Sequence, residues 1–302
     1  MSATSVNYPT QTIDSFWGTT QQFKLYTING IKAYVISINP GTLSGGSSPA
    51  WTISGTNPAI THITVKANNN PILDADTITL FERNANLMHI SPDGLNYLIP
   101  LALPYYKGGY LPNTEFPSFE YTDVELVLTF APLSQITSGS PTGSSGTEMN
   151  YSEDYILRQL VDTKKLLRPR VFQYSTILNN VNSYNDLTSF LPQVGTYQSI
   201  QLFASTNLTS PYSGGSNTAI TNVELLLNQV NKPLSTNFNL LRLQNAAAFG
   251  RSQDTGFATI QFSYGTSGLV TSDLNALKNL DLRVFNNTSS PVYLNALATI
   301  FV

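Results

Sequence analysis

The chain of 302 residues contains two histidines, the side chain that most often acts as a general base near neutral pH. His62 lies in a segment that alternates apolar and polar residues, and His89 lies in a stretch typical of a loop. They are far apart in the sequence, and neither belongs to a metal-binding or nucleophile motif. We therefore interpret both as structural or surface residues.

Two acidic groups could in principle carry chemistry. Asp74 and Asp76 could offer oxygen ligands to Ca²⁺, but the glycine and distal Glu of an EF-hand are missing, and Asp residues between strands are more often turn formers. A glycosidase carboxylate pair could come from Glu115, Glu120, Asp123 and Glu125. On a strand, however, Glu120 and Asp123 would fall on opposite faces. We predict solvated polar residues here, no catalytic residue, no bound metal and no cofactor, and hence not an enzyme.

The densest basic cluster is formed by Lys164, Lys165, Arg168 and Arg170. Its simpler interpretation is the C-terminal end of a helix, where positive charge complements the helix dipole. The functional alternative is a patch that faces an anionic membrane or nucleic acid, with each residue adding about 1 kcal/mol near a bilayer surface. The net charge of -3 argues against a protein that coats nucleic acid, because such proteins are basic.

The composition indicates a folded protein with a weakly charged surface. Hydrophobic residues make up 41% of the chain and charged residues 11%, against about 25% charged residues in typical globular proteins. Such a surface favours close contact with further copies of the chain, because few charges must be desolvated. The chain has no cysteine, which excludes disulfides and thiolate metal sites. We find no signal-peptide pattern and no membrane-spanning apolar run, and expect synthesis in the cytosol.

Strand-like segments dominate the chain. Alternation or β-rich composition predicts strands at residues 60–67, 77–83, 121–132, 171–178, 199–205, 219–231, 257–265, 280–287 and 292–302. Asn29-Gly30 predicts a hairpin within residues 23–40. Two prolines place residues 95–106 at an edge or a corner.

Helical patterns are fewer. Residues 152–168 form the clearest predicted helix, with Ser152 as N-cap, acidic residues in the first turn, basic residues in the last turn and Pro169 at the end. Residues 238–249 fit a helix or a strand, and residues 272–280 fit a short helix.

The chain has a low-complexity stretch near its midpoint, residues 134–150, rich in Ser, Thr, Gly and Pro. We interpret it as a linker between two β-domains; a long surface loop inside one large domain is the alternative. The predicted divisions are an N-terminal arm at 1–22, a first domain at 23–133, the linker, and a second domain at 151–302.

The two halves also resemble each other. Residues 60–85 and 219–246 both read as a strand, an Asn-containing turn, a proline, a polar spacer and an apolar segment that ends in a basic residue and Asn. The offset of roughly 160 residues is the size of an ordinary domain, as a duplicated β-sandwich requires. Two all-β sequences of this composition could also align this well by chance, so the repeat is a hypothesis.

Two strand-rich halves, long Gly/Ser/Pro loops, a short helix at the junction and a cysteine-free, weakly charged surface resemble double jelly-roll major capsid proteins. These form the shells of tailless icosahedral viruses, and a lipid-containing bacteriophage is our particular expectation. The resemblance covers the layout of the whole chain and rests on no diagnostic motif. It implies an all-β fold of two tandem eight-stranded jelly-roll barrels with a few short helices. A helix at 238–249 would be an insertion between strands, which the family tolerates.

The resemblance also implies partners and a location. The chain would form homotrimers that tile the virion shell as pseudo-hexagonal capsomers, next to neighbouring capsomers, penton and minor capsid proteins, and around an internal membrane. No sequence-specific nucleic acid is implied. The arm 1–22 and the basic residues 164–170 would lie near the shell base, and the loops 41–58 and 134–150 at an outer tower or at barrel junctions.

Two other classes fit the same composition. One is a receptor-binding or glycan-binding spike or adhesin, in which Tyr, Asn and Trp51 on loops would contact sugar. The other is a glycan-active β-sandwich enzyme with an unrecognised carboxylate pair.

Overall fold

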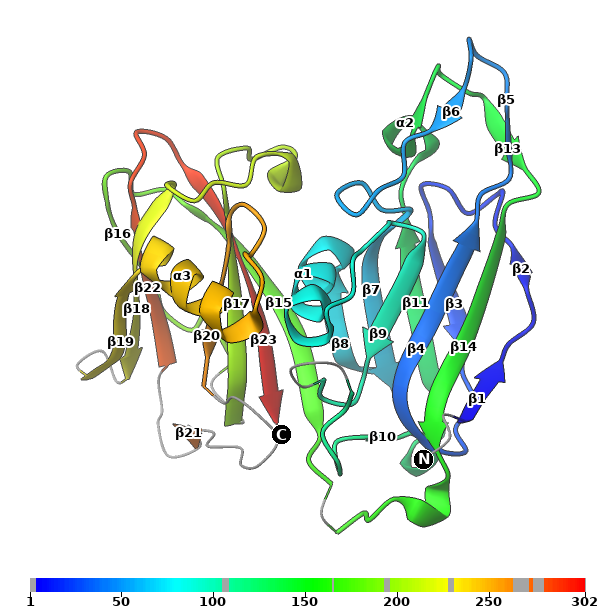
Figure 1. Cartoon of the computed structure of the whole chain (residues 1–302), viewed down its shortest axis with the longest axis horizontal. Coiled ribbons are helices and arrows are strands. Elements are labelled where there is room, and N and C mark those ends of the chain that lie inside the picture. Colours follow the sequence, from blue (N-terminus) through cyan, green and yellow to red (C-terminus); the bar gives the residue numbers. More distant parts are fainter. Residues whose placement is uncertain are drawn as a thin grey trace. The chain divides into compact units, whose positions relative to one another are not determined.

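The computed structural model describes residues 4–104, 109–164, 166–192, 196–227, 231–262, 272–273 and 280–301. The chain divides into two compact units, which we call unit 1 (Met1–Pro169) and unit 2 (Arg170–Val302). Each consists mainly of antiparallel strands, with a few short helices (Figure 1).

Unit 1 contains two antiparallel sheets, each built on four main strands. The first has the spatial order β1 (Thr4–Asn7), β14 (Glu148–Ile156), β4 (Gly30–Asn39) and β9 (Asn96–Pro100). The short strands β2 (Gln11–Thr12) and β10 (Phe116–Pro117) pair with β14 and β4. The second sheet has the order β3 (Thr20–Lys24), β11 (Val124–Phe130), β7 (Ile60–Ala67) and β8 (Asn70–Asp76).

Unit 2 contains two sheets as well. The first has the order β15 (Pro169–Leu178), β23 (Val292–Phe301), β17 (Thr196–Ser205) and β20 (Phe257–Gln261), with β21 (Ser272–Asp273) also beside β17. The second has the order β16 (Ser183–Leu187), β22 (Leu280–Asn286), β18 (Ile220–Leu227) and β19 (Asn231–Asn237).

The strand order is the same in both units. If the eight main strands of each unit are numbered along the chain, each unit has one sheet with the order 1-8-3-6 and one with the order 2-7-4-5. Two four-stranded antiparallel sheets with these crossovers form a jelly roll. The predicted all-β fold of two tandem eight-stranded jelly rolls is confirmed.

A helix follows the fifth strand in each unit, α1 (Thr77–Met88) in unit 1 and α3 (Phe238–Phe249) in unit 2. In α1, Asn84 Nδ2 donates to the carbonyl oxygen of Leu98 on β9 at 2.7 Å. In α3, Asn245 Nδ2 donates to the carbonyl oxygen of Thr259 on β20 at 2.8 Å. Both residues of the pair are shifted by the same 161 positions, from 84 to 245 and from 98 to 259. The predicted internal repeat is therefore present in the fold.

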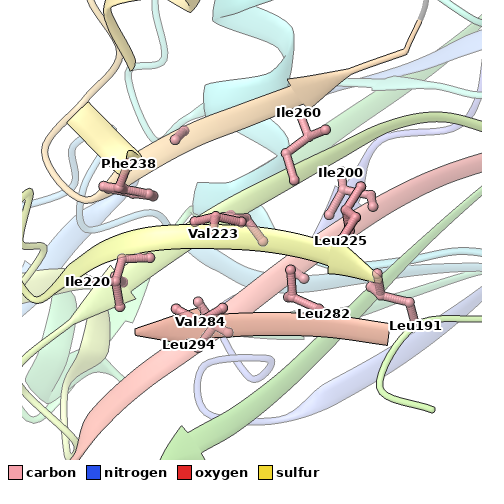
Figure 2. Close-up of a cluster of buried hydrophobic side chains, with 14 of the residues drawn as sticks. Leu191, Ile200, Ile220, Val223, Leu225, Phe238, Ile260, Leu282, Val284 and Leu294 are labelled. Carbon is pink, nitrogen blue, oxygen red and sulfur yellow. The ribbon is translucent and has the colours of Figure 1, made fainter. Parts of the chain in front are cut away.

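The core of unit 2 lies between its two sheets. Val223, Leu225, Leu282 and Val284 come from one sheet, and apolar residues of β17, β20 and β23 face them from the other (Figure 2). Phe238, the first residue of α3, closes the cluster at one side and is fully buried. Burial of apolar surface of this kind stabilises a fold by about 25 cal/mol per Å².

The hairpin predicted around Asn29-Gly30 is wrong. β3 and β4 flank this dipeptide but belong to different sheets, so the connection crosses from one sheet to the other. Gly30 serves packing instead, because a Cβ atom there would lie 2.7 Å from Cγ2 of Val161 and 2.9 Å from Cγ2 of Ile156.

The strand predicted at residues 77–83 is also wrong, because these residues begin α1. Asp76 is the extended residue before the helix, and Thr79 Oγ1 donates to its carbonyl oxygen at 2.7 Å. The alternation in this short segment fits a strand, but the buried positions Leu80, Asn84 and Leu87 follow helical spacing.

The predicted helix at 152–168 is wrong as well. Residues up to Ile156 continue strand β14, and only a short 3₁₀ turn, η2 (Arg158–Leu160), follows. Hydrogen bonding of β14 to β4 on one side and to β1 on the other outweighs the helical pattern. Residues 134–150 are therefore not a linker between the units, whose division lies at Pro169 and Arg170.

The N-terminal residues do not form a separate arm in the part of 1–22 that the structure describes. β1 and β2 pair with β14, β3 begins at Thr20, and Ile13 is fully buried. Where the structure describes them, the remaining predicted strands agree with it, including β9 at an edge beside β4 and the terminal strand β23 within a sheet. Residues 238–249 are helical. Most of the predicted helix at 272–280 lies outside the described residues.

No helix in the described ranges is long and apolar enough to cross a membrane.

We predict that Asn245→Leu destabilises unit 2 by about 2–4 kcal/mol, because it leaves two buried backbone groups without partners. Asn245 is fully buried; its Nδ2 donates to the carbonyl of Thr259, and its Oδ1 accepts from the N–H of the same residue at 2.7 Å. Urea denaturation monitored by circular dichroism measures the change. Gln244→Leu, on the exposed side of the same helix, is the control. Equal stability of the two variants would contradict the role of Asn245.

Candidate functional site

His62 lies between two carboxylates on the hairpin formed by β7 and β8. The connecting residues Asn68 and Asn69 have φ values of 47° and 66°, as a two-residue hairpin turn requires. His62 is paired with Asp76 across the strands, with 2.7 Å between its Nδ1 and Oδ1 of Asp76. Its Nε2 lies 2.9 Å from Oδ1 of Asp74. The sequence reasoning considered His62 apart from the pair Asp74 and Asp76, and the hairpin brings all three together.

The two carboxylates keep the His62 side chain protonated at neutral pH. Burial alone would lower the pKa of His62, but the hydrogen bonds to Asp74 and Asp76 and their negative charges raise it to about 9. The hydrogen bond from His62 in turn lowers the pKa of Asp74. At neutral pH His62 is therefore an imidazolium that donates to both carboxylates, and it has no free lone pair with which to act as a base. Its effect is to join β7 to β8.

The same contacts occupy oxygen atoms of Asp74 and Asp76, the two residues considered as Ca²⁺ ligands. Both carboxylates are hydrogen-bonded to His62, and Asp74 also accepts from Oγ1 of Thr64 at 2.7 Å. In the described part of the chain, no group of three His, Cys, Asp or Glu side chains could hold a metal ion.

Two of the four acidic residues considered for glycoside hydrolysis form ion pairs with basic side chains. Oε2 of Glu120 lies 2.8 Å from an Arg168 guanidinium nitrogen, and Oδ1 of Asp123 lies 3.6 Å from Nζ of Lys24. Glu125 is buried on β11. Because Glu120 and Asp123 are held by different partners, the contacts give no support to the carboxylate pair of a glycosidase.

The basic cluster is divided between the units. Lys164 and Arg168 belong to unit 1, Arg170 belongs to β15 of unit 2, and Lys165 lies outside the described residues. Lys164 is exposed, and its backbone N–H donates to Oδ1 of Asp162 at 3.2 Å. Only the 3₁₀ turn η2 precedes this cluster, so the interpretation as the end of an α-helix is wrong. Arg168 is paired with Glu120. The interpretation of the cluster as a membrane-facing or nucleic-acid-facing patch stays a prediction.

A projection extends beyond the sheets at one end of unit 1 (Figure 1). The two Gly- and Ser-rich loops pair in it: β5 (Thr42–Ser44) with β13 (Gly143–Ser145), and β6 (Ala50–Trp51) with β12 (Thr137–Ser138). The helix α2 (Leu133–Ile136) precedes β12. Gly46 and Gly139 have positive φ, and a Cβ atom on either would meet the backbone of the facing loop. The close approach of these two loops thus explains their glycine content, which the sequence analysis interpreted as the sign of a linker.

Aromatic and acidic residues fix the base of the projection. The rings of Trp17 and Trp51 lie 5.4 Å apart. Nε1 of Trp17 donates to Oγ of Ser144 at 2.9 Å. Asp14 accepts from the backbone N–H groups of Gly146 and Thr147, each at 3.0 Å. Sequence reasoning missed the contacts of Asp14 and Trp17, because their partners lie more than a hundred residues away.

The opposite end of unit 1 exposes apolar side chains. β4 and β14 meet there through the pairing of Gly30 with Ile156, and Oγ of Ser118 donates to the carbonyl of Asn29 at 2.6 Å. The Arg158 guanidinium lies 4.9 Å from the centre of the Phe119 ring. We call this region the apolar end; its exposed large side chains are Tyr26, Ile28, Leu157, Leu160 and Leu167.

No protein-family model and no curated protein matches this sequence. The fold, however, matches solved viral structures over nearly the whole chain. The crystal structure of the STIV MCP has a TM-score of 0.70 at 16% identity, covering 99% of this chain and 97% of that chain. The atomic structure of Sulfolobus turreted icosahedral virus gives 0.71 at 15% identity, with 98% and 90% covered. The major capsid protein P2 from bacteriophage PM2 gives 0.68 at 10% identity, with 100% and 98% covered. These likenesses establish that the chain has the double jelly-roll fold of such proteins.

We predict that unit 1 loses stability between about pH 6.5, where a free histidine titrates, and about pH 9, where His62 titrates in the fold. Because the folded-state pKa is raised, the contribution is complete below the lower value and disappears as the pH rises through the upper one. His62→Gln should reduce this pH dependence, measured by urea denaturation from pH 6 to pH 9.5. His89→Asn, which suits the positive φ at that position, is the control. An unchanged pH profile in the His62 variant would refute the assignment.

Proposed function

We propose that this chain is a major capsid protein, the repeated structural subunit of an icosahedral virus shell. The strongest support comes from two observations together. The chain repeats one eight-strand order, with a helix after the fifth strand, and its fold matches the viral structures over nearly the whole length of both chains. A capsid role needs no catalytic residue, since it depends on how one chain meets other copies.

The two ends of unit 1 support this role. The projection at one end is rich in Ser, Thr and Gly, and the apolar end exposes Tyr26, Ile28 and Leu160. A shell subunit has an outward and an inward side that meet different surroundings. In our proposal the projection formed by the loops 41–58 and 134–150 points outward, which agrees with the outer tower expected for these loops. The apolar end points inward.

We propose that the chain assembles as homotrimers, whose six barrels form pseudo-hexagonal capsomers. The low charge of the chain favours this packing, because the cost of desolvating charges between neighbouring copies is small. Neighbouring capsomers are the main partners, with penton and minor capsid proteins at special positions of the shell. The proposed location is the virion, after synthesis in the host cytoplasm.

We also propose that the apolar end contacts an internal membrane. Exposed aliphatic residues flanked by basic residues bind the interface of anionic bilayers, because apolar burial and charge attraction add together. Ile28 and Leu160 would enter the interface, and Lys164 and Lys165 follow Leu160 closely in the sequence.

The capsid proposal predicts that the purified protein is a trimer with a mass three times that of the 33.0 kDa chain. Size-exclusion chromatography with light scattering measures the mass, and negative-stain microscopy should show pseudo-hexagonal blocks. A stable monomer at high protein concentration would contradict the proposal.

The membrane proposal predicts that the double variant Ile28→Glu, Leu160→Glu binds anionic vesicles at least about tenfold more weakly than the unchanged protein, because each side chain loses about 1.5–3 kcal/mol of apolar burial. Flotation with vesicles of phosphatidylcholine and phosphatidylglycerol measures the bound fraction. Leu208→Glu changes an exposed leucine of unit 2 and is the control. Equal binding by all three proteins would exclude the apolar end, and no binding by the unchanged protein would exclude the membrane contact.

A further inference from the structure

The outer face of α3 is apolar although it is exposed. Leu240 and Leu243 are 49% and 68% exposed, and Ala247 is exposed on the same side. Positions separated by three and seven residues lie on one face of a helix, so these side chains form a continuous stripe. Single exposed leucines are common, but adjacent ones on one face mark a contact surface.

The rest of α3 is fixed within unit 2. The helix begins at Asn237, whose side chain accepts from the N–H groups of Asn239 and Leu240. Its one charged residue, Arg242, donates from Nε to the carbonyl of Phe257 at 2.9 Å and from a terminal nitrogen to the carbonyl of Gln253 at 2.8 Å. The outer stripe therefore lies on a firmly held helix and carries no charge.

The duplicated helix α1 gives a direct comparison. The same shift of 161 positions that relates Asn84 to Asn245 relates Thr79, Glu82 and Asn86 to Leu240, Leu243 and Ala247. In α1 these residues are polar but only 1%, 3% and 2% exposed. This face of the helix is thus buried in α1 and exposed in α3.

We propose that the stripe formed by Leu240, Leu243 and Ala247 is the surface on which a second copy of this chain docks. The comparison with α1 points to a second copy, because the equivalent face of the repeated helix is buried. The stripe also carries no charge that docking would desolvate, and the helix beneath it is held in place, so the surface is suited to docking. This inference rests on the proposed capsid function, which brings copies into contact, and identifies the part of unit 2 that makes the contact.

The variant Leu240→Glu, Leu243→Glu tests the inference. Both side chains are exposed in a single chain, so the fold of the single chain, and with it the circular dichroism spectrum, should stay unchanged. Two carboxylates in an apolar contact should weaken assembly by at least about tenfold, so light scattering should show a shift toward the single-chain mass of 33.0 kDa. Ile28→Glu is the matched control, because Ile28 is 63% exposed and receives the same charge. It should assemble like the unchanged protein.

The outcomes separate this inference from the capsid proposal. If the unchanged protein forms trimers and the α3 variant assembles equally well, the inference is wrong and the capsid proposal stands. If the unchanged protein is a monomer, both are wrong. If the Ile28 variant dissociates as well, the effect is not specific to α3 and the inference is wrong.

A second measurement detects contact directly and does not depend on disrupting it. The chain has no cysteine, so Leu243→Cys and Ile28→Cys each introduce a single thiol. In the assembled protein, a bulky maleimide should label position 243 at least about tenfold more slowly than position 28. Dilution below the assembly concentration should make the two rates similar. Equal rates in the assembled protein would refute the inference.

Discussion

The structure depends on the insertion of the last strand of each unit between the first and the third. In unit 1, β14 pairs with β1 on one edge and with β4 on the other, and in unit 2, β23 lies between β15 and β17. In each unit, the sheet that contains this last strand is incomplete until the end of the unit has been added. This constraint fixes residues 148–156 in unit 1, holds the N-terminal residues 4–7 in a sheet, and leaves the paired loops of unit 1 free to form a projection.

Features that depend on neighbouring residues could be predicted from the sequence. The alternating segment 60–67 and the Asn68-Asn69 turn define a hairpin through local geometry alone. The repeat was detectable because each half encodes two strands followed by a helix in the same order. The all-β class of two similar halves followed from these local patterns, whereas the tandem jelly-roll arrangement was implied by the resemblance to capsid proteins.

Features that depend on distant partners could not be predicted. Glu153 belongs to the charged start of the predicted helix, yet it is buried on β14 and accepts from the hydroxyl of Tyr8 at 2.9 Å. Burial raises the pKa of Glu153, and the hydrogen bond from Tyr8 lowers it in part. The cluster of His62, Asp74 and Asp76 can be recognised only when the register of β7 and β8 is known. The basic residues near 164–170 can be interpreted only when the pairing of Arg168 with Glu120 is known.

The two units share a fold and differ in their surfaces, and this difference is where function can reside. Unit 1 carries the projection between β4 and β7 and between β11 and β14, whereas shorter connections at 206–219 and 287–291 occupy the equivalent places in unit 2. Buried Asn84 and Asn245 keep the same contact in both, which shows that the scaffold has been preserved. Glu82 and Leu243 occupy equivalent helix positions, one buried and one exposed. A duplicated scaffold with unequal surfaces can meet its neighbours in only some orientations, so the asymmetry between the units can itself direct assembly.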